Sequence, residues 1–252
     1  MNAIIGHTGF VGSNLIKKLK FDYMFNTVNI NEITDHNYDL VVCAGIPSLK
    51  WAANKNPKED LNNIIKLTNI LKNVKCDYFI LISTIDVFEK TSNNPDLVKC
   101  SEFHHPYGFN RYYAEEKLKK IFGDKLTIIR LPAVFGDNLK KNILFDLLNG
   151  KIYNKINLCD KYQWYDVRDL WNDINCIFGG GISEINLFSE PISMKEIMDE
   201  CFVIWDKTQF YYDCDSAVSY DLISRIEYPY YWGNKNKIIT KLKTFTSAYG
   251  TS

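Results

Sequence analysis

The chain has 252 residues, enough for one large domain, or a domain with an added lobe, to bury a hydrophobic core. Thirty basic and thirty acidic residues cancel and no basic block stands out, so charge gives no reason to expect nucleic acid or a membrane surface as a partner. No apolar run approaches the roughly 20 residues of a membrane-spanning helix, and no secretory leader precedes the first apolar run, which favours the cytoplasm.

Short apolar runs alternate with helical patterns through the first half of the chain. Strands are expected at residues 3–5, 23–28, 39–43, 78–82 and 126–131, and helices at 11–19, 60–72 and 107–122. This α/β alternation predicts βαβ units and a doubly wound parallel sheet that is covered on both faces. Ligands of such sheets bind in a crevice at the carboxyl ends of the strands.

The pattern becomes weaker after residue 135. Helices are expected at 142–148 and at 193–202, the second with Ser193 as N-cap and Glu196 three residues on. The tyrosine-rich stretch 210–231 is expected to form short strands and loops. We therefore predict a main domain over residues 1–135 and a small lobe over residues 136–252, which closes over the crevice and shares a strand with the main sheet.

The cysteines and histidines give no sign of a cross-linked or metal-binding protein. Seven cysteines are scattered, odd in number and without a CxxC pair, and the four histidines lack metal-ligand spacing. We expect reduced thiols in a reducing compartment rather than a disulfide framework, and no metal site.

A glycine loop follows the first predicted strand and should open a helix. Gly6 allows a sharp turn, Gly9 lets the backbone approach a pyrophosphate, and Gly12 allows close packing of helix and strand. The helix N-terminus offers N–H groups and a positive dipole end to the phosphates. The loop thus predicts a dinucleotide site made by Gly6, Thr8, Gly9, Phe10, Val11 and Gly12.

The residues that would choose between NAD and NADP are neutral. The second predicted strand ends near Asn26, Thr27 and Asn29, where an acidic residue would bind the ribose hydroxyls of NAD. No arginine precedes Arg111, so a clamp for the 2′-phosphate of NADP is also missing. Either cofactor is therefore expected, with Asn26 as a contact.

Four more segments follow the glycine loop in a fixed order. They are Ser83-Thr84-Ile85-Asp86-Val87-Phe88, Pro106-Tyr107-Gly108-Phe109-Asn110-Arg111 leading to Ala114-Glu115, Arg130-Leu131-Pro132-Ala133-Val134-Phe135-Gly136, and Trp164-Tyr165-Asp166-Val167-Arg168-Asp169-Leu170. Together with the loop they resemble the extended short-chain dehydrogenase/reductase family, in its branch of sugar-nucleotide epimerases, dehydratases and 4-keto reductases. The matches run from residue 2 to about residue 170, and they imply a Rossmann fold with a small C-terminal substrate lobe.

The resemblance implies three catalytic residues. Thr84 corresponds to the family's catalytic Ser/Thr, and its hydroxyl can orient the substrate oxygen. Tyr107 corresponds to the catalytic tyrosine, a phenol that carries the proton if its pKa of about 10 is pulled toward neutrality. Arg111 stands where the family has lysine; it keeps the positive charge that would lower the pKa of Tyr107 and bond the nicotinamide ribose, with a planar fork in place of an ammonium. Tyr113 and Lys117 form a second Tyr-x-x-x-Lys pattern, which faces another side of the helix.

The resemblance also implies contacts outside the catalytic residues. The implied cofactor contacts are Ala44 and Gly45 at the adenosine half, Pro132 and Val134 along the nicotinamide, and Ser83. The implied substrate contacts are Asp86, Asn142, which opens a helix beside two lysines, and Arg168. Arginine suits bidentate contact with a diphosphate, and a surface ion pair is the alternative for Arg168.

These observations predict an NAD(P)-dependent oxidoreductase acting on a nucleotide-activated sugar. Reduction of a 4-keto sugar is the leading expectation, with epimerase or dehydratase chemistry next. One alternative is a non-catalytic dinucleotide-binding sensor or scaffold of the same fold, and another is a small-molecule reductase outside sugar metabolism. The resemblance also suggests a homodimer.

Overall fold

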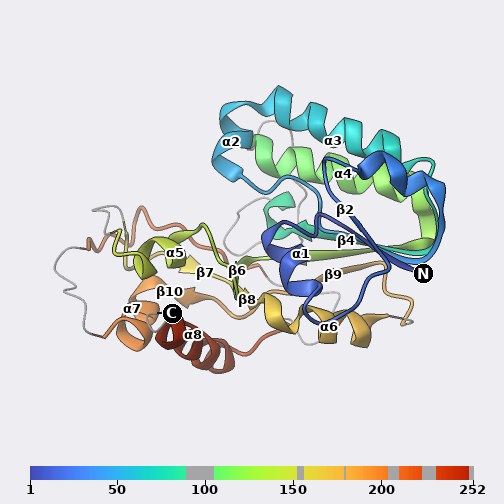
Figure 1. Ribbon diagram of the computed structural model, residues 1–252. Helices are drawn as coiled ribbons and strands as arrows, with labels where there is room; N and C mark the ends of the chain where they lie inside the picture. Colours follow the sequence, from blue (N-terminus) through green and yellow to red (C-terminus); the bar gives the residue numbers. More distant parts are fainter. Residues whose placement is uncertain (89–104, 152–155, 179, 204–209, 223–230, 250–252) are drawn as a thin grey trace. The chain divides into compact units, whose positions relative to one another are not determined.

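The computed structural model describes residues 1–252 apart from 89–104, 152–155, 179, 204–209, 223–230 and 250–252 (Figure 1). The described residues form two compact units. The first lies within Met1–Glu89, Val98–Leu131 and Arg168–Asn186, and the second within Pro132–Val167 and Leu187–Ser252. The sequence predicts one boundary after residue 135, whereas the chain returns to the first unit for residues 168–186.

The first unit is built on a six-stranded parallel sheet in the order β2-β1-β3-β4-β5-β9. Its strands are β1 (Asn2–Ile5), β2 (Tyr23–Phe25), β3 (Asn37–Cys43), β4 (Lys75–Thr84), β5 (Leu126–Leu131) and β9 (Glu184–Asn186). The predicted doubly wound sheet is confirmed. The strand order reverses between β1 and β3, and in such sheets the ligand crevice opens at this reversal, at the carboxyl ends of the strands.

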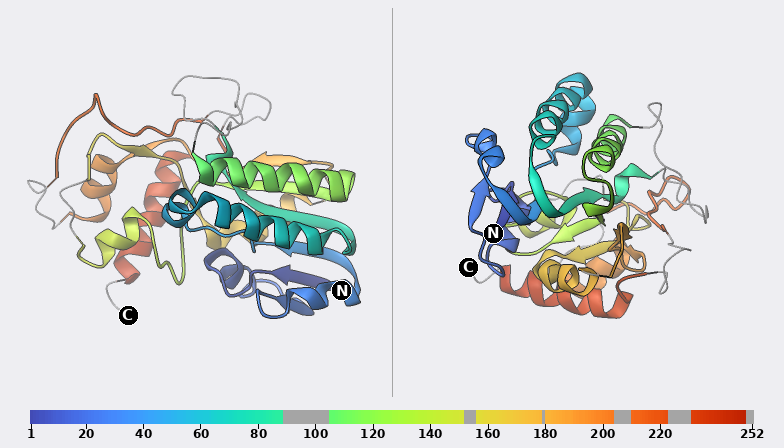
Figure 2. Two further views of the ribbon diagram at one scale, coloured as in Figure 1. Left: turned by 90° about the horizontal axis from the view of Figure 1, so that it is seen from above. Right: turned by 90° about the vertical axis from the view of Figure 1, so that its right-hand side faces the viewer.

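Helices cover both faces of this sheet. In Figures 1 and 2, α3 (Pro57–Leu71) and α4 (Pro106–Phe122) lie side by side on one face, while α1 (Phe10–Leu15) and α6 (Leu170–Ile177) lie on the other. The short α2 (Lys50–Lys55) packs against α3 and α4. Single 3-10 turns occupy Ile30–Asp35, Ile85–Val87, Gly123–Lys125 and Val167–Asp169.

Local sequence explains where the two long helices of the first unit begin and end. Pro57 and Pro106 stand in their first turns, where a missing N–H costs no hydrogen bond. Gly123 ends α4 with a φ of 53°, a conformation that glycine adopts without strain. Phe122, the last residue of α4, stacks on Phe79 of β4 with 4.0 Å between ring centroids, which ties the helix to the sheet.

In its described residues, the second unit combines two small strand pairs with three helices. β6 (Ala133–Phe135) pairs in parallel with β8 (Trp164–Asp166), and β7 (Lys161–Tyr162) pairs antiparallel with β10 (Ile192–Ser193). The helices are α5 (Ile143–Leu148), α7 (Met194–Cys201) and α8 (Lys235–Tyr249). The predicted capping box is present at α7, where Ser193 and Glu196 bond each other's backbone N–H groups. Part of the predicted stretch 210–231 lies outside the described residues.

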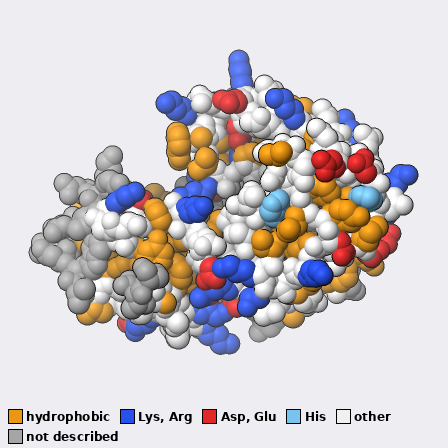
Figure 3. Space-filling model, in the orientation of Figure 1, with side chains coloured by type: hydrophobic (Ala, Val, Ile, Leu, Met, Phe, Trp, Pro, Cys, Tyr) orange, Lys and Arg blue, Asp and Glu red, His pale blue; other side chains and the backbone are white. Residues whose placement is uncertain are grey.

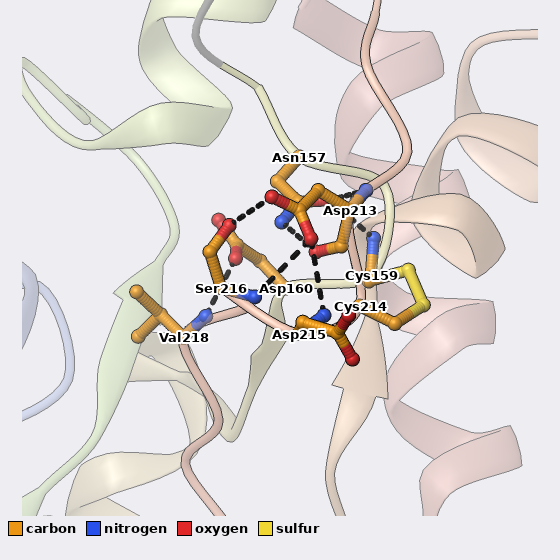
Figure 4. The surroundings of a disulfide bond; sticks show 8 residues. All are labelled: Asn157, Cys159, Asp160, Asp213, Cys214, Asp215, Ser216 and Val218. Atoms are coloured by element: carbon orange, nitrogen blue, oxygen red, sulfur yellow. Dashed lines mark hydrogen bonds between the residues drawn. A yellow bond between two sulfur atoms is a disulfide. The ribbon is translucent and has the colours of Figure 1, made fainter.

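A disulfide joins Cys159 to Cys214 in the second unit, so the expectation of reduced thiols is wrong for these two residues. The two cysteines are 55 residues apart and form no CxxC pattern, so no local pattern indicated that they pair. Figure 4 shows hydrogen bonds beside the bond: the Asn157 amide spans the backbone of Asp213, and Asp160 accepts from the N–H of Val218. The disulfide therefore cross-links two segments that hydrogen bonds from the Asn157 and Asp160 side chains also hold together.

Replacing both Cys159 and Cys214 with serine is expected to lower the free energy of unfolding by about 4 kcal/mol, because the cross-link closes a loop of 55 residues. Denaturant unfolding of the oxidised protein measures this change. The matched control is Cys176→Ser, because Cys176 is exposed and free, and its loss is expected to cost less than about 0.5 kcal/mol. Equal stability of the double variant and the control would contradict the cross-link.

Candidate active site

The glycine loop lies where the strand order of the main sheet reverses. Gly6 follows β1 with a φ of 83°, and a Cβ there would lie 2.5 Å from the carbonyl oxygen of Ala44, the residue after β3. A Cβ on Gly12 would lie 2.2 Å from the carbonyl oxygen of Gly6. These two glycines are therefore required by the close approach of the backbone segments.

Gly9 differs from the other two glycines of the loop. It is the N-cap of α1 in an extended conformation, with its N–H bonded to the carbonyl of Gly6 at 3.0 Å. A Cβ on Gly9 would have one neighbour within 4 Å, the Gly6 oxygen at 3.2 Å. A side chain here would require the Gly6 carbonyl to shift by a few tenths of an ångström, a smaller change than at Gly6 or Gly12. The first N–H groups of α1 lack partners within the helix.

Tyr107 is held at the start of α4 by contacts from other elements. Its backbone N–H donates to Oδ1 of Asn54 on α2 at 3.0 Å. His105 caps the helix by accepting from the N–H of Gly108 through Nδ1. A Cβ on Gly108 would lie 2.1 Å from the Asp86 carbonyl oxygen, so glycine is what lets α4 approach the turn after β4.

The environment of Tyr107 keeps its phenol protonated. Burial is the main cause that raises the pKa of Tyr107 to about 12, and the carboxylates of Asp86 and Asp60 act in the same direction. The charge of Arg111 and a hydrogen bond with Thr84 lower the pKa and offset part of this rise. Thr84 ends β4, and its Oγ1 accepts from the N–H of Asp86 at 3.2 Å. The two hydroxyls that the sequence selects are thus brought together, whereas Tyr113 lies against Lys117, with the ammonium 5.2 Å from its ring centroid.

Arg111 is fixed within the protein. A guanidinium has five N–H donors, and all five are used here. Nε and Nη2 donate to the carbonyl of Pro47. Nη1 and Nη2 donate to the two carboxylate oxygens of Asp60, and Nη1 also donates to the carbonyl of Tyr107. Its central carbon lies 3.9 Å from the ring centroid of Tyr107. The expected bond to a ribose finds no remaining donor, because Arg111 holds α4 to α3 and to the loop after β3.

A second ion pair, between Lys50 and Asp86, lies beside the ring of Tyr107, and the sequence analysis did not identify it. Lys50, the first residue of α2, donates to Oδ1 of Asp86 at 2.6 Å, and its Nζ lies 5.7 Å from the ring centroid of Tyr107. His105 adds its ring at 6.4 Å from that of Tyr107, and its Nε2 lies 4.0 Å from the same Asp86 oxygen. Asp86, an expected substrate contact, is thus paired within the protein.

A buried charge network connects α4 to the main sheet. Ser83, expected as a cofactor contact, donates to Oε1 of Glu115 at 2.6 Å. Arg130 on β5 donates to both carboxylate oxygens of Glu115 and to Glu184 on β9. Glu115 and Arg130 are almost fully buried. The network joins α4 to three neighbouring strands, so it fixes the helix that carries Tyr107.

The remaining expected contacts lie in separate elements of the structure. At the end of β2, the side chain of Asn26 accepts from the N–H of Val28 within a turn. In the second unit, Asn142 caps α5 by accepting from Phe145 N–H at 3.0 Å, and its amide donates to the carbonyl of Val134 at 2.8 Å. Pro132 precedes β6 and Val134 lies in it. Arg168 lies in the 3-10 turn Val167–Asp169.

The sequence did not identify several residues that build the site. They are Lys50, Asn54, Asp60 and His105. Only His105 carried a local signal, because it stands directly before the Pro-Tyr-Gly that opens α4. The other three act through contacts that require the packing of α2 and α3 against α4.

Comparison with known proteins shows which solved structures have a similar fold, which the strand order alone does not. No family model matches the sequence, and no curated protein matches it. Among solved structures, UDP-glucose 4-epimerase of Thermotoga maritima matches with a TM-score of 0.74 at 14% identity, over 100% of this chain and 99% of that one. The dTDP-glucose 4,6-dehydratase of Streptomyces venezuelae, solved with NAD, matches with a TM-score of 0.74 at 13% identity, over 100% and 98%.

A reductase has the same architecture. The dTDP-4-dehydrorhamnose reductase of Yersinia enterocolitica matches with a TM-score of 0.67 at 15% identity, over 98% of this chain and 99% of that one. The first unit thus has a Rossmann-type fold. More narrowly, the whole chain has the fold found in sugar-nucleotide epimerases, dehydratases and reductases.

Of the helices in the described part of the chain, none is both long and apolar enough to span a bilayer.

Proposed function

We propose that the protein is an NAD(P)-dependent oxidoreductase that reduces a keto group on a nucleotide-activated sugar. The observation that carries the proposal is the pairing of Tyr107 with Thr84 at the carboxyl end of β4. The glycine loop follows β1 in the same parallel sheet, so both features lie at the edge where such sheets bind ligands. The similarity of the fold to sugar-nucleotide enzymes supports the substrate class.

The residues divide the reaction between them. A bound nicotinamide would supply the hydride to the carbonyl carbon. Tyr107 donates its phenolic proton to the carbonyl oxygen as the alcohol forms. The hydroxyl of Thr84, which is hydrogen-bonded to Tyr107, would orient the same oxygen. Gly6, Gly9 and Gly12 would accept the pyrophosphate.

The pH dependence should differ between the two directions of the reaction. Reduction needs protonated Tyr107, whose pKa of about 12 keeps it protonated through the neutral range, so the rate should stay level from about pH 6 to pH 9. Oxidation needs the tyrosinate, so its rate should rise about tenfold per pH unit over the same range. Initial rates followed by NAD(P)H absorbance measure both, and a plateau of the oxidation rate near neutral pH would contradict the assignment.

A substrate panel tests the proposal itself. NADH or NADPH is mixed with nucleotide-linked 4-keto sugars, and loss of absorbance reports reduction. Affinity for UDP, GDP or dTDP without a sugar separates a sugar-nucleotide enzyme from a reductase of other small molecules. Cofactor binding without turnover across the panel would instead support the non-catalytic sensor or scaffold.

The homodimer and the compartment belong to the same proposal. Leu49 and Trp51 are 47% and 69% exposed, and Figure 3 shows hydrophobic side chains gathered at the α2 end of the helical layer, a surface that a second copy could cover. Light scattering of the wild type and of Trp51→Ser tests this dimer. Cytoplasm is proposed as the compartment, and the disulfide between Cys159 and Cys214 is the observation that opposes it, because disulfides are rare in reducing compartments. Alkylation of free thiols in cell lysate tests the proposal: labelled Cys159 and Cys214 would support the cytoplasm, and protection of both would contradict it.

A further inference from the structure

The turn after β2 lies where the adenosine ribose of a dinucleotide would be recognised. β2 pairs with β1, which leads into the glycine loop. In sheets of this kind, residues after the second strand distinguish the ribose hydroxyls of NAD from the 2′-phosphate of NADP. Residues 26–29 form this turn, and none of them is acidic or basic. The choice therefore depends on the hydrogen-bonding groups that the turn leaves open.

The last carbonyl of β2 is already used within the protein. Its oxygen, on Phe25, accepts from the N–H of Gly6 at 2.8 Å, and Nδ1 of His7 lies 3.1 Å from it. A carbonyl can only accept, so Nδ1 of His7 is the donor in this pair. The two donors occupy both lone pairs of the oxygen, which leaves none for a ribose hydroxyl.

The two asparagines of the turn are fixed by the backbone around them. Asn29 accepts from the N–H of Asn26 at 2.9 Å through Oδ1 and donates through Nδ2 to the carbonyl of Met24 at 3.1 Å. Asn26 accepts from the N–H of Val28 at 2.8 Å through Oδ1. Because an N–H needs an acceptor, this bond determines which end of the Asn26 amide is oxygen, and Nδ2 is turned away from that N–H.

Asn26 therefore decides what the turn can recognise. Its Nδ2 carries two hydrogens and has no partner among the residues that the structure describes. Thr27 is exposed beside it, but a hydroxyl both donates and accepts and so suits either cofactor. The Nδ2 hydrogens can only be donated. They match phosphate oxygens, which only accept, better than ribose hydroxyls, whose hydrogens need an acceptor.

We propose that Asn26 selects the 2′-phosphate of NADP, so that the protein uses NADP(H) in preference to NAD(H). The inference rests on the proposed function, in that a dinucleotide binds at the glycine loop. A neutral amide takes the place of an arginine here, and its hydrogen bond to a phosphate is charge-assisted. One such bond is expected to change the affinity by about tenfold or more.

Cofactor binding without turnover tests the proposal. NADPH and NADH differ only in the 2′-phosphate, and isothermal titration calorimetry measures the affinity of the protein for each. The wild type should bind NADPH at least about tenfold more tightly than NADH. In Asn26→Asp, one oxygen still accepts from Val28 while the donor becomes a charged acceptor, so the preference should be lost or reversed.

Asn31→Asp is the matched control for the added charge. Asn31 is exposed in the 3-10 turn Ile30–Asp35, five residues after Asn26, so the same charge is placed where solvent and salt screen it. This variant should keep the preference for NADPH within about threefold of the wild type.

The outcomes separate this inference from the proposed function. Equal affinity of the wild type for the two cofactors, or a preference that Asn26→Asp keeps or Asn31→Asp loses equally, overturns the role of Asn26 even if a sugar nucleotide is reduced. A preference for NADH that Glu32→Gln removes also overturns it, because the first carboxylate after β2 would then accept from the ribose. A wild type that binds neither cofactor overturns the dinucleotide site and this inference with it. A tenfold preference for NADPH that only Asn26→Asp abolishes supports the role even if no tested sugar reacts.

Discussion

Replacing Glu115 with glutamine is expected to lower the free energy of unfolding by about 3 kcal/mol, because the change leaves the buried guanidinium of Arg130 without its bidentate partner. Glu115 is 0% exposed and Arg130 is 1% exposed, so water cannot replace the lost carboxylate. Glutamine has nearly the same shape, which separates the loss of charge from the loss of packing. Denaturant unfolding measures the change.

The neighbouring residue provides the control. Glu116 pairs with Lys119 at 3.0 Å, and both side chains are more than a third exposed. Such a pair contributes about 0–1 kcal/mol, so Glu116→Gln should unfold almost like the wild type. If the two variants lose the same small amount, the buried network does not hold α4 to the sheet as we describe.

Turnover should fall about a thousandfold in Tyr107→Phe, because the phenyl ring keeps the packing of Tyr107 but has no proton to donate. The backbone hydrogen bond to Asn54 and the stacking on Arg111 do not require the hydroxyl. Cofactor affinity should therefore stay within about twofold of the wild type. Steady-state rates and a cofactor titration measure the two quantities on the same preparation.

Tyr113→Phe is the matched control for the catalytic assignment, because it removes a hydroxyl from the same helix and from the alternative Tyr-x-x-x-Lys pattern. Tyr113 contacts Lys117 rather than Thr84, so this variant should keep wild-type turnover. A large loss in Tyr113→Phe with a small one in Tyr107→Phe would reverse the assignment of the proton carrier.

The features that the sequence predicted well depend on local patterns. Continuous apolar runs located five strands of the main sheet, and the spacing of Gly6, Gly9 and Gly12 located the turn at the reversal of strand order. The three-residue β9 carries too little pattern to be predicted and is defined by its pairing with β5. By contrast, α8 was missed although its sequence carries a helical signal: Ile238, Leu242 and Phe245 recur at helical spacing and are buried.

The details of the site depended on contacts between distant segments, which no local pattern contains. Asp60 meets Arg111 across 51 residues, and Lys50 meets Asp86 across 36. The sequence shows that position 111 is an arginine, but the packing of α3 on α4 determines that Asp60 is its partner. The same holds for Cys159 and Cys214, whose pairing required the fold of the second unit.

The measurement that tests the account most directly is binding of NADH and NADPH to the wild type and to Gly9→Ala by isothermal titration calorimetry. The wild type should bind at least one of the two cofactors. Among the described residues, the alanine Cβ would contact the Gly6 oxygen at 3.2 Å, which must shift by a few tenths of an ångström, so Gly9→Ala should still fold and melt within a few degrees of the wild type. Its cofactor affinity should fall at least about tenfold, because the Cβ occupies the approach of the pyrophosphate. A wild type that binds neither cofactor, or a folded Gly9→Ala that binds as tightly as the wild type, would contradict a dinucleotide site at this loop.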